Sequence, residues 1–399
     1  MSWDKVKLAD CCLSISDGDH QPPPKAVTGV PFVTIANINK SNQFDFNDTM
    51  FVPKDYYDRL DSKRKAQVGD ILNSVVGSFG IPVLIKEERP FVFQRHIAIL
   101  RPNERINSAF LYYTMLSRDF YAKADAAAIG AAQRTVSLTS LRGMEIELPP
   151  LKVQEAIASK LSAYDNLIEN NQKQIKLLEE AAQRWYKEWF VDLRFPGYED
   201  TPIVDGVPEG WERATIDSRI SLLSGYAFKS AQFDSSGEYK IVTIKNVKDG
   251  EFNGINTSRI VSIPDKMPRH CVLVDGDILL SLTGNVGRTC IVNGNNYLLN
   301  QRVAKLQSDI PAFTYCLFRS SDMFDAMNNL ANGAAQQNLS PIRTGKVVVL
   351  FPSNRLLSEF DTIAGSYLSK ILNLRKQSEL AIQARDRLLP KLMSGEIEV

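Results

Sequence analysis

Three short segments of the chain carry the side-chain types with which proteins read the edges of nucleic-acid bases. The segments are Gln94-Arg95-His96, Gln133-Arg134-Thr135 and Gln336-Gln337-Asn338. Arginine can pair two donors with guanine, and asparagine or glutamine can pair with adenine. We therefore expect these segments to lie on loops that contact DNA bases.

Other side chains complete the predicted set of DNA contacts. Lys25, Arg288 and Arg302 have the charge needed to hold phosphates. The remaining predicted contacts are His20, Ser78, Phe79 and Asn285. Any one of these residues is more often an ordinary surface or turn residue, so the prediction rests on the group and on the fold that positions it.

The motifs of common enzyme active sites do not occur in the sequence. Gln21-Pro22-Pro23-Pro24 lacks both the Asn and the aromatic residue of an adenine-methyltransferase loop. The glycines at 77, 80, 284 and 287 lack the Lys-Ser/Thr ending of a phosphate loop. The three histidines have no consistent Ser, Cys or Asp partners, and His96 aligns with Val303 in the repeat described below. We expect no catalytic residues on this chain.

The bulk composition limits the class of protein. With 399 residues, two domains of ordinary size are expected. Lys and Arg number 47 against 46 Asp and Glu, so DNA contacts would have to come from local patches. The five cysteines form no Cys-x-x-Cys pair, so no metal site is expected. The longest apolar run, Val347 to Phe351, is too short to span a membrane, which predicts a soluble, reduced, cytoplasmic protein.

An internal repeat determines how the candidate residues must be positioned. Trp3-Asp4-Lys5 returns as Trp211-Glu212-Arg213, 208 residues later. Three further blocks return 207 residues later: Gly69-Asp70-Ile71-Leu72 as Gly276-Asp277-Ile278-Leu279, Gly77-x-x-Gly80 as Gly284-x-x-Gly287, and Gln94-Arg95 as Gln301-Arg302. A constant offset over several blocks indicates a duplicated domain.

The later part of the repeat is offset by 203 residues. Gly130-Ala131-Ala132-Gln133 matches Gly333-Ala334-Ala335-Gln336, and Pro149 matches Pro352. The residues that follow the first match diverge from Arg-Thr-Val to Gln-Asn-Leu, so two loops of one frame could read different bases. Runs such as Phe32 to Ile35 and Ile71 to Val76 predict strands of a mixed sheet, and Ser108 is a plausible N-cap of a helix. The predicted class is α+β.

Each copy is followed by a predicted long helix of about 33 residues, hence about 50 Å. Its apolar residues recur at alternating steps of four and three, which is typical of a coiled coil. The first seam contains Ile157, Leu161, Tyr164, Ile168, Asn171, Ile175, Leu178, Ala182, Trp185 and Trp189. The second contains Phe360, Ala364, Tyr367, Ile371, Leu374, Ser378, Ala381, Arg385, Leu388 and Leu392. We expect an antiparallel two-helix spacer between two similar globular domains related by a pseudo-twofold axis.

These features predict five segments. They are a first globular domain at 1–150, a central helix at 151–194, a linker at 195–210, a second globular domain at 211–352, and a distal helix with its tail at 353–399. A twofold arrangement would also bring the tail after Leu392 back beside the first domain.

The whole chain resembles a known family, the DNA-specificity subunits of type I restriction-modification systems. The marks are the domains that open at Trp3 and Trp211, the Gly-Asp-Ile-Leu strands, and Pro149 and Pro352 before the helices. The joint from Trp189 to Gly197 and the ending from Leu388 to Ile397 also resemble that family.

The resemblance implies that each globular domain is a target-recognition domain for one half of a split DNA site, with the coiled coil setting the spacer. It implies two docked modification subunits that carry S-adenosylmethionine and methylate adenine. It also implies restriction subunits that use ATP and Mg²⁺, with no cofactor on this chain. Ser378 and Arg385 on the distal seam put the tightness of the spacer in doubt.

Three other functions are open at this point. The chain could be a stand-alone regulator that binds a bipartite DNA site, and association with a methyltransferase subunit would argue against this. It could be an autonomous methyltransferase, which binding of S-adenosylmethionine by the isolated chain would support. It could also be a scaffold that uses the coiled coil alone, which specific binding of a bipartite duplex would exclude.

Overall fold

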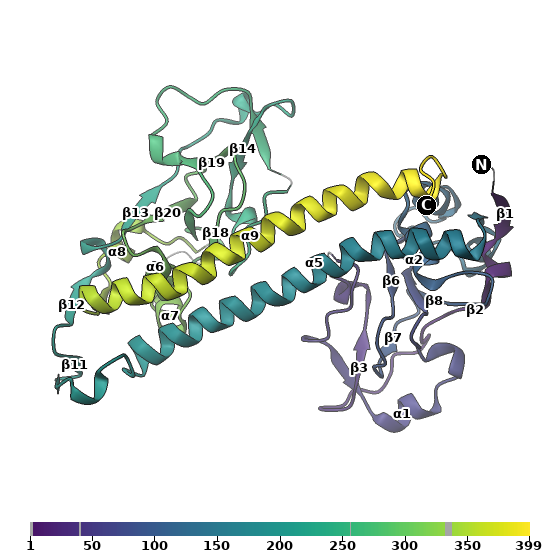
Figure 1. The fold of residues 1–399 in the computed structure, drawn as a ribbon, viewed down its shortest axis with the longest axis horizontal. Coiled ribbons are helices and arrows are strands. Elements are labelled where there is room, and N and C mark those ends of the chain that lie inside the picture. Colours follow the sequence, from purple (N-terminus) through teal and green to yellow (C-terminus); the bar gives the residue numbers. More distant parts are fainter. Residues whose placement is uncertain (1–2, 40, 256, 332–336) are drawn as a thin grey trace. The chain divides into compact units, whose positions relative to one another are not determined.

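A computed structural model describes residues 3–39, 41–255, 257–331 and 337–399 (Figure 1). Its contacts divide the chain into two compact units. The first unit comprises Met1–Leu167 and Ala381–Val399, and the second comprises Ile168–Leu380. Each unit therefore contains one globular part and a portion of both long helices.

The first unit is built on two small sheets and a strand pair. Its antiparallel four-stranded sheet has the order β2 (Cys12–Asp17), β8 (Ile97–Pro102), β5 (Ile71–Ser74) and β6 (Pro82–Leu84). Its three-stranded sheet has the order β4 (Met50–Val52), β3 (Val30–Val33) and β7 (Val92–Phe93), in which β3 and β7 are parallel. The strand pair joins β1 (Asp4–Lys7) to β9 (Glu145–Leu148). Of the two runs predicted to be strands of a mixed sheet, the one from Phe32 provides β3 of the mixed three-stranded sheet, whereas the one from Ile71 forms β5 of the antiparallel sheet, so the prediction was wrong for β5.

Four short helices and part of α5 cover these sheets. They are α1 (Lys54–Arg59), α2 (Ser108–Leu116), α3 (Arg118–Ala127), α4 (Leu138–Gly143) and the start of α5 (Leu151–Tyr186). The N-cap of α2 is Asn107, whose side chain accepts a hydrogen bond from the Phe110 amide, so the prediction of Ser108 was wrong by one residue. Ser117 ends α2 and caps α3 in the same way, which divides the predicted single helix into two.

The second unit repeats this topology. Its antiparallel four-stranded sheet has the order β13 (Ser221–Ser224), β20 (Val303–Gln307), β17 (Ile278–Ser281) and β18 (Thr289–Ile291). A mixed sheet has the order β15 (Ser258–Ile260), β14 (Tyr239–Val242), β19 (Tyr297–Leu299) and β16 (Val272–Leu273). β12 (Glu212–Thr215) pairs with β21 (Val348–Phe351), as β1 pairs with β9. The predicted duplication is thus confirmed at the level of strand order.

The helices of the second unit also correspond to those of the first. They are α6 (Pro311–Phe318), α7 (Ser321–Leu330), α8 (Pro341–Gly345) and the start of α9 (Asn354–Met393). After Tyr186 the chain makes a π-helical turn, Lys187–Val191, and the segment predicted as a linker contains a hairpin of β10 (Ile203–Val204) and β11 (Val207–Pro208). Phe195 and Trp211, at the two ends of that segment, are buried against each other.

A capped turn ends the equivalent strands β3 and β14. Each strand runs into a Thr-Ile-x-Asn sequence, at Thr34–Asn37 and Thr243–Asn246. The Asn side chain accepts hydrogen bonds from the amide and the hydroxyl of the Thr in both units. Because this satisfies the amide of the turn, the predicted strand Phe32 to Ile35 stops at Val33 and becomes a short 3₁₀ helix.

Segments of α5 and α9 pack side by side within each unit. In the second unit, Tyr186 contacts Phe360 while Asn171 donates to the carbonyl oxygen of Leu374. Higher numbers on α5 thus meet lower numbers on α9, so these segments are antiparallel, as predicted (Figure 1). In the first unit, Leu389 and Leu392 join the core around Ile157 and Leu161.

The end of the chain also belongs to the first unit. Gly395 lies against the Trp3 ring, and Ile397 packs against the core of that unit. The expectation that the tail returns beside the first domain is confirmed by these contacts.

The seam of α5 departs from the predicted heptad at its C-terminal end. Trp185 is 38% exposed, and the adjacent Tyr186 is buried in its place. Leu388 and Leu389 show the same shift at the equivalent position of α9, where Leu389 is the buried residue. A straight helix drifts by about 20° per heptad, so over four heptads the buried stripe moves by nearly one residue. The choice of Trp185 as a seam residue was therefore wrong.

The other predicted seam positions face the packed side of their helices. The buried ones are Ile157, Leu161, Ile168, Asn171, Ala182, Trp189, Phe360, Ala364, Ile371, Leu374, Ala381 and Leu392. Tyr164, Ile175, Leu178, Tyr367 and Leu388 are partly buried. The hydroxyl group of Ser378 donates to the Leu374 carbonyl oxygen, which satisfies this polar group inside its own helix.

Candidate nucleic-acid interface

Four loops of the first unit meet at one end of its four-stranded sheet. Antiparallel pairing places the ends of β2 and β5 beside the start of β8, because Asp17 pairs with Ala98 and Ser74 with Ile97. Loops 17–20, 75–80 and 94–96 adjoin these strand ends, and the loop 129–136 between α3 and α4 joins them through a bridge between Val76 and Thr135. We call them the first loop edge.

Backbone hydrogen bonds hold the loops of the first loop edge together. The Arg95 amide donates to the Asp19 carbonyl, and the Val75 amide donates to the His96 carbonyl. The Gly77 amide donates to the Arg134 carbonyl. The structure thus brings together predicted residues from four segments of the first copy, which lie up to 115 positions apart in the sequence, from His20 to Thr135.

Arg134 is the most firmly oriented of these residues. Its Nη1 donates to Asp125 Oδ1 at 2.5 Å, and its Nη2 donates to the Asp125 carbonyl oxygen. The guanidinium also lies 5.4 Å from the centre of the Phe79 ring, which stacks on Tyr121. Phe79 is buried, so its predicted role as a direct DNA contact is better described as support for Arg134.

The remaining predicted residues of the first unit differ in placement. Ser78, Arg95 and Gln133 are exposed on the first loop edge. His20 is exposed there too, and its Nε2 lies 2.8 Å from Asp17. Lys25 is exposed beside Ala26, which pairs with Phe51 in the other sheet, and no described contact joins it to the first loop edge.

His96 is half-buried in the first loop edge. Burial and the neighbouring Arg95 charge lower the pKa of His96, so the imidazole is neutral at pH 7. A neutral imidazole offers one donor and one acceptor. His96 can therefore form hydrogen bonds with a base or sugar. It is less suited to binding a phosphate, because the neutral imidazole carries no positive charge.

The second unit has an equivalent set of loops, 224–226, 282–288, 300–302 and 337–339, which we call the second loop edge. The Gln301 amide donates to the Tyr226 carbonyl, and the Leu282 amide donates to the Arg302 carbonyl. The Gly284 amide donates to the Gln337 carbonyl. These bonds repeat the pattern of the first loop edge one for one.

The hydrogen-bond pattern corrects one part of the sequence alignment. Leu282 corresponds to Val75, so Arg302 occupies the place of His96, and Gln301 occupies that of Arg95. The offset here is 206, because six residues separate Ile291 of β18 from Leu298 of β19, whereas seven separate the equivalent residues Leu84 of β6 and Val92 of β7. The match of Gln94-Arg95 with Gln301-Arg302, and that of His96 with Val303, were wrong by one residue.

The predicted residues of the second unit lie on its loop edge. Asn285, Arg302, Gln337 and Asn338 are exposed, and Thr283 donates from Oγ1 to Asn338 Oδ1 at 3.0 Å. Arg288 is half-buried, with its guanidinium 4.8 Å from the centre of the Phe324 ring. Gln336 lies outside the described residues.

Two glycines were missed by the sequence reasoning. A Cβ at Gly18 would overlap the carbonyl oxygens of Phe93 and Gln94, and a Cβ at Gly225 would overlap those of Leu299 and Asn300. Each glycine therefore allows a close backbone approach that joins two loops of its edge. The sequence offered a signal, because the two glycines are separated by the same 207 residues as the Gly69 and Gly77 blocks of the repeat.

Tyr121 and Phe324 were also missed. They occupy equivalent positions, 203 residues apart, on α3 and α7. Each carries its ring beside the Gly-x-x-Gly turn of its own loop edge, as its contacts with Gly80 and Gly287 show. A helix residue gives no sequence signal for such a role, since the contact joins segments far apart in the chain.

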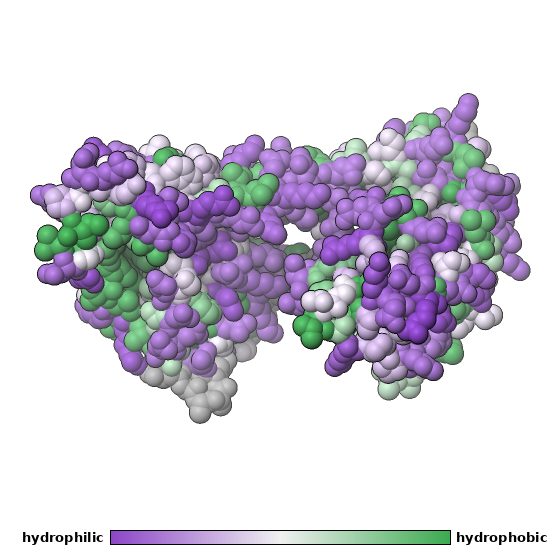
Figure 2. Space-filling model, turned by 90° about the horizontal axis from the view of Figure 1, so that it is seen from below, coloured by the Kyte–Doolittle hydropathy of each residue, from purple (hydrophilic) through white to green (hydrophobic). Residues whose placement is uncertain are grey.

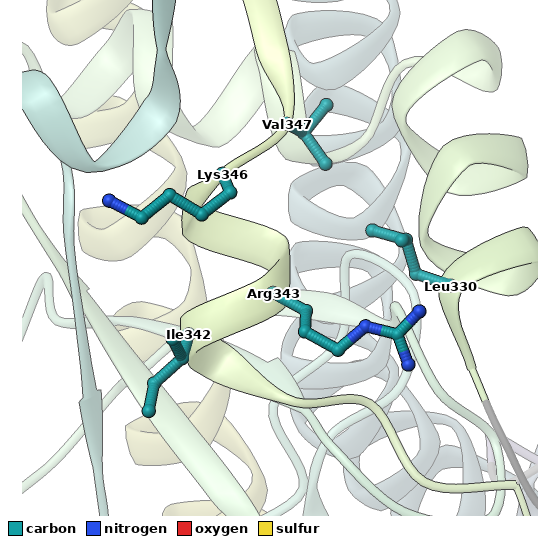
Figure 3. A pocket seen from close by; sticks show the side chains of 5 residues that line it. All are labelled: Leu330, Ile342, Arg343, Lys346 and Val347. Carbon is teal, nitrogen blue, oxygen red and sulfur yellow. The ribbon is translucent and has the colours of Figure 1, made fainter.

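A shallow hollow of about 330 Å³ lies beside α8, away from the second loop edge. It is lined by Leu330, Ile342, Arg343, Lys346 and Val347. Figure 3 shows Arg343 and Lys346 extending in different directions, so their charges do not converge on one point. Lys346 is instead paired with Asp217 at 2.7 Å.

Two further features, a metal-binding cluster and a membrane-spanning helix, do not occur in the described part of the chain. No three His, Cys, Asp or Glu side chains of the described residues are arranged to hold a metal ion. Within the same residues, no helix has the length and apolar content needed to cross a bilayer.

Comparison with known proteins gives a consistent result. Residues 2–180 match the family model described as the type I restriction modification DNA specificity domain. The type I restriction enzyme MjaIX specificity subunit of Methanocaldococcus jannaschii is 24% identical over 75% of this chain and 71% of its own length. The HindI specificity subunit of Haemophilus influenzae is 20% identical over 99% of both chains.

A solved structure supports the fold. The crystal structure of a type I restriction-modification S subunit from M. genitalium superimposes with a TM-score of 0.60 at 16% identity, covering 98% of this chain and 96% of that one. The duplicated fold is that of a solved specificity subunit, and residues 2–180 carry the type I restriction modification DNA specificity domain. Over most of its length the chain is similar to DNA-specificity subunits of type I restriction-modification systems.

Proposed function

We propose that the chain selects the DNA site of its restriction-modification complex by reading an asymmetric bipartite sequence, one half with each loop edge. One observation carries the proposal: the two edges have the same backbone hydrogen-bond frame and different side chains. Arg95, His96, Arg134 and Thr135 of the first edge are replaced by Gln301, Arg302, Gln337 and Asn338 in the second. A shared frame with changed donors and acceptors suits two readers of different base sequences.

The second part of the proposal concerns α5 and α9. A pair of packed helices is a stiff element, so these helices would set the unspecified spacer between the half-sites. The antiparallel packing within each unit supports this role. A pseudo-twofold relation between the two target-recognition domains is part of the same proposal.

The third part concerns partner subunits. Two modification subunits would dock on this chain and carry S-adenosylmethionine, and restriction subunits would add ATP- and Mg²⁺-dependent cleavage. Exposed apolar side chains are consistent with docking, because large apolar patches on a protein surface commonly mark interfaces. In the second unit these include Trp185, Val191, Ile203, Val204, Ile342 and Val348, and Figure 2 shows apolar side chains gathered on that unit. We also propose that the complex acts in the cytoplasm.

Mapping of methylated adenines in a genome that carries this system would test the proposal. We expect one asymmetric motif made of two short specified halves and an unspecified spacer. A continuous palindrome would contradict the model of two readers. Exchanging residues 1–150 for the corresponding domain of a relative should change one half of the motif and leave the other half unchanged.

A copurification experiment separates this proposal from that of a stand-alone regulator. The tagged chain should retain modification subunits when purified from cells that express both. Specific binding of the bipartite duplex by the chain alone, with no association with a modification subunit, would instead support the regulator.

A further inference from the structure

Arg134, Asp125 and Phe79 form a preassembled group on the first loop edge. The carboxylate and the carbonyl oxygen of Asp125 hold two guanidinium nitrogens, and the buried Phe79 ring supports the guanidinium plane. The Arg134 side chain is still 43% exposed. A guanidinium has five N–H donors, so the two used by Asp125 leave three for a ligand.

The second copy of the repeat has different residues at all three positions of this group. The residues equivalent to Phe79, Asp125 and Arg134 are Val286, Asn328 and Gln337. The second unit has thus lost the guanidinium, the carboxylate that orients it and the ring that supports it. Such a joint replacement is expected if Asp125 and Phe79 serve Arg134.

Capping of α3 does not explain the group. Arg134 bonds the Asp125 carbonyl in the last turn of α3, and a cation at that position stabilises a helix end. At the end of the equivalent helix α7 the Ala331 amide donates to the carbonyls of Met327 and Asn328, as the Ala128 amide donates to the Asp125 carbonyl in α3, and no described hydrogen bond joins a guanidinium to them. The helix end therefore does not require an arginine.

The geometry points to Arg134 as the residue that reads a guanine in the half-site bound by the first unit, with Asp125 and Phe79 as its positioning residues. Guanine presents two acceptors, O6 and N7, on one edge in the major groove, and an oriented guanidinium matches both. The second unit, with Gln337 at the same place, reads a different base there; glutamine suits the donor and acceptor of adenine. This inference rests on the proposed function.

The test uses the complete complex with its modification subunits. For each specified position of the motif, methylation rates are measured on four duplexes that differ only in the base pair at that position. The double variant Asp125→Asn, Arg134→Gln installs two of the three side chains of the second unit in the first and keeps Phe79. We expect the preference for one guanine to fall by about 5- to 150-fold and adenine to become accepted at that position.

Two controls keep the result interpretable. Lys123→Gln removes another positive charge from an Asp pair on the same helix, since Lys123 contacts Asp119 at 2.7 Å, and should leave all base preferences unchanged. Unchanged preferences for the other half-site in the double variant would show that the complex still assembles and binds.

Three results overturn the inference. One is an equal loss of rate on all four duplexes, as expected for a purely structural Arg134. Another is an unchanged preference at every position. The third is a bipartite motif in which neither half contains guanine. Failure of the proposed function looks different, because the unmodified complex would then show no bipartite motif at all.

Discussion

Asp165 on α5 and Arg385 on α9 form a buried ion pair within the first unit, with Nη1 and Oδ1 2.7 Å apart and side chains 12% and 20% exposed. The other oxygen of Asp165 accepts a hydrogen bond from the Tyr113 hydroxyl at 2.7 Å. Burial and the Asp165 charge raise the pKa of Tyr113, so the hydroxyl stays protonated and donates. Arg385, which the heptad pattern marked as a weak point of the helix pair, is therefore a compensated charge.

Replacing Asp165 by Ala should strongly destabilise the first unit. The change removes the Asp165 carboxylate from the largely buried Arg385, which keeps its contact with Asp386, so we expect a loss of about 3–5 kcal/mol. Hydrogen–deuterium exchange of peptides from α2 and α5 would measure the loss in this unit alone. Asp119→Ala is the control, because the exposed Asp119–Lys123 pair should contribute less than about 1 kcal/mol. Equal effects of the two substitutions would contradict the prediction.

Glu179 has a comparable role in the second unit. It accepts hydrogen bonds from Arg375 at 2.9 Å and from the Tyr315 hydroxyl at 3.4 Å, and it pairs with Arg319 at 3.5 Å. Arg375 also donates to the Gly250 carbonyl, so this group connects α5, α6 and α9 to the loop after β14. Glu179→Ala should cost about 3–5 kcal/mol, because it removes the carboxylate shared by two largely buried arginines.

The neighbouring residue provides the control for Glu179. Glu180 is 52% exposed and contacts Lys176 at 3.9 Å. Glu180→Ala should change the unfolding free energy by less than about 1 kcal/mol. Urea unfolding followed by the fluorescence of Trp189 and Trp211, both buried in the second unit, would measure both variants. A loss below 1 kcal/mol for Glu179→Ala would show that the arginines find other compensation.

Gly18→Ala and Gly225→Ala should each disturb one loop edge. The added Cβ overlaps backbone carbonyls, so the loops must separate, at a cost of about 1–3 kcal/mol or more. Gly18→Ala should weaken recognition of one half-site and Gly225→Ala that of the other, as measured by methylation of duplexes mutated in one half. Gly143→Ala, where a Cβ meets no atom within 4 Å, should leave both halves unaffected. Loss of both half-sites in a single glycine variant would argue against independent edges.

The buried thiol of Cys290 should lower the unfolding free energy of the chain at alkaline pH. Burial in β18 raises the pKa of this free thiol from its ordinary value of 9.0 to about 12. The unfolded chain therefore loses the thiol proton at a lower pH than the folded one. The stability contributed by Cys290 is complete below about pH 9 and is lost as the pH rises toward 12, by at most about 1.4 kcal/mol per pH unit.

The variant Cys290→Ala isolates this effect. Its unfolding free energy should be lower than that of the unmodified chain at pH 8 because of the lost packing, and should fall less steeply between pH 9 and 11. Urea unfolding at a series of pH values would give both slopes. Equal slopes would mean that the Cys290 thiol loses its proton at the same pH in the folded and the unfolded chain, so that burial does not raise its pKa.

Several features of the fold follow from the sequence because they depend on local or periodic patterns. The duplication is visible as a constant offset, and it was confirmed by the strand order of the two units. The long helices follow from apolar residues at helical spacing. The gathering of Arg95, His96 and Arg134 could be expected in outline, since each follows a strand or a glycine-rich turn.

The tertiary structure decided which residues are partners. The orientation of Arg134 depends on Asp125 and Phe79, the latter 55 positions away, and Arg385 meets an Asp that is 220 positions distant. The repeated Gln-Arg dipeptide suggested a register that the backbone hydrogen bonds moved by one residue, and the drift of a real helix against the heptad exchanged Trp185 for Tyr186. Sequence periodicity specifies elements and their apolar faces, whereas pairing between side chains depends on long-range packing that no local pattern contains.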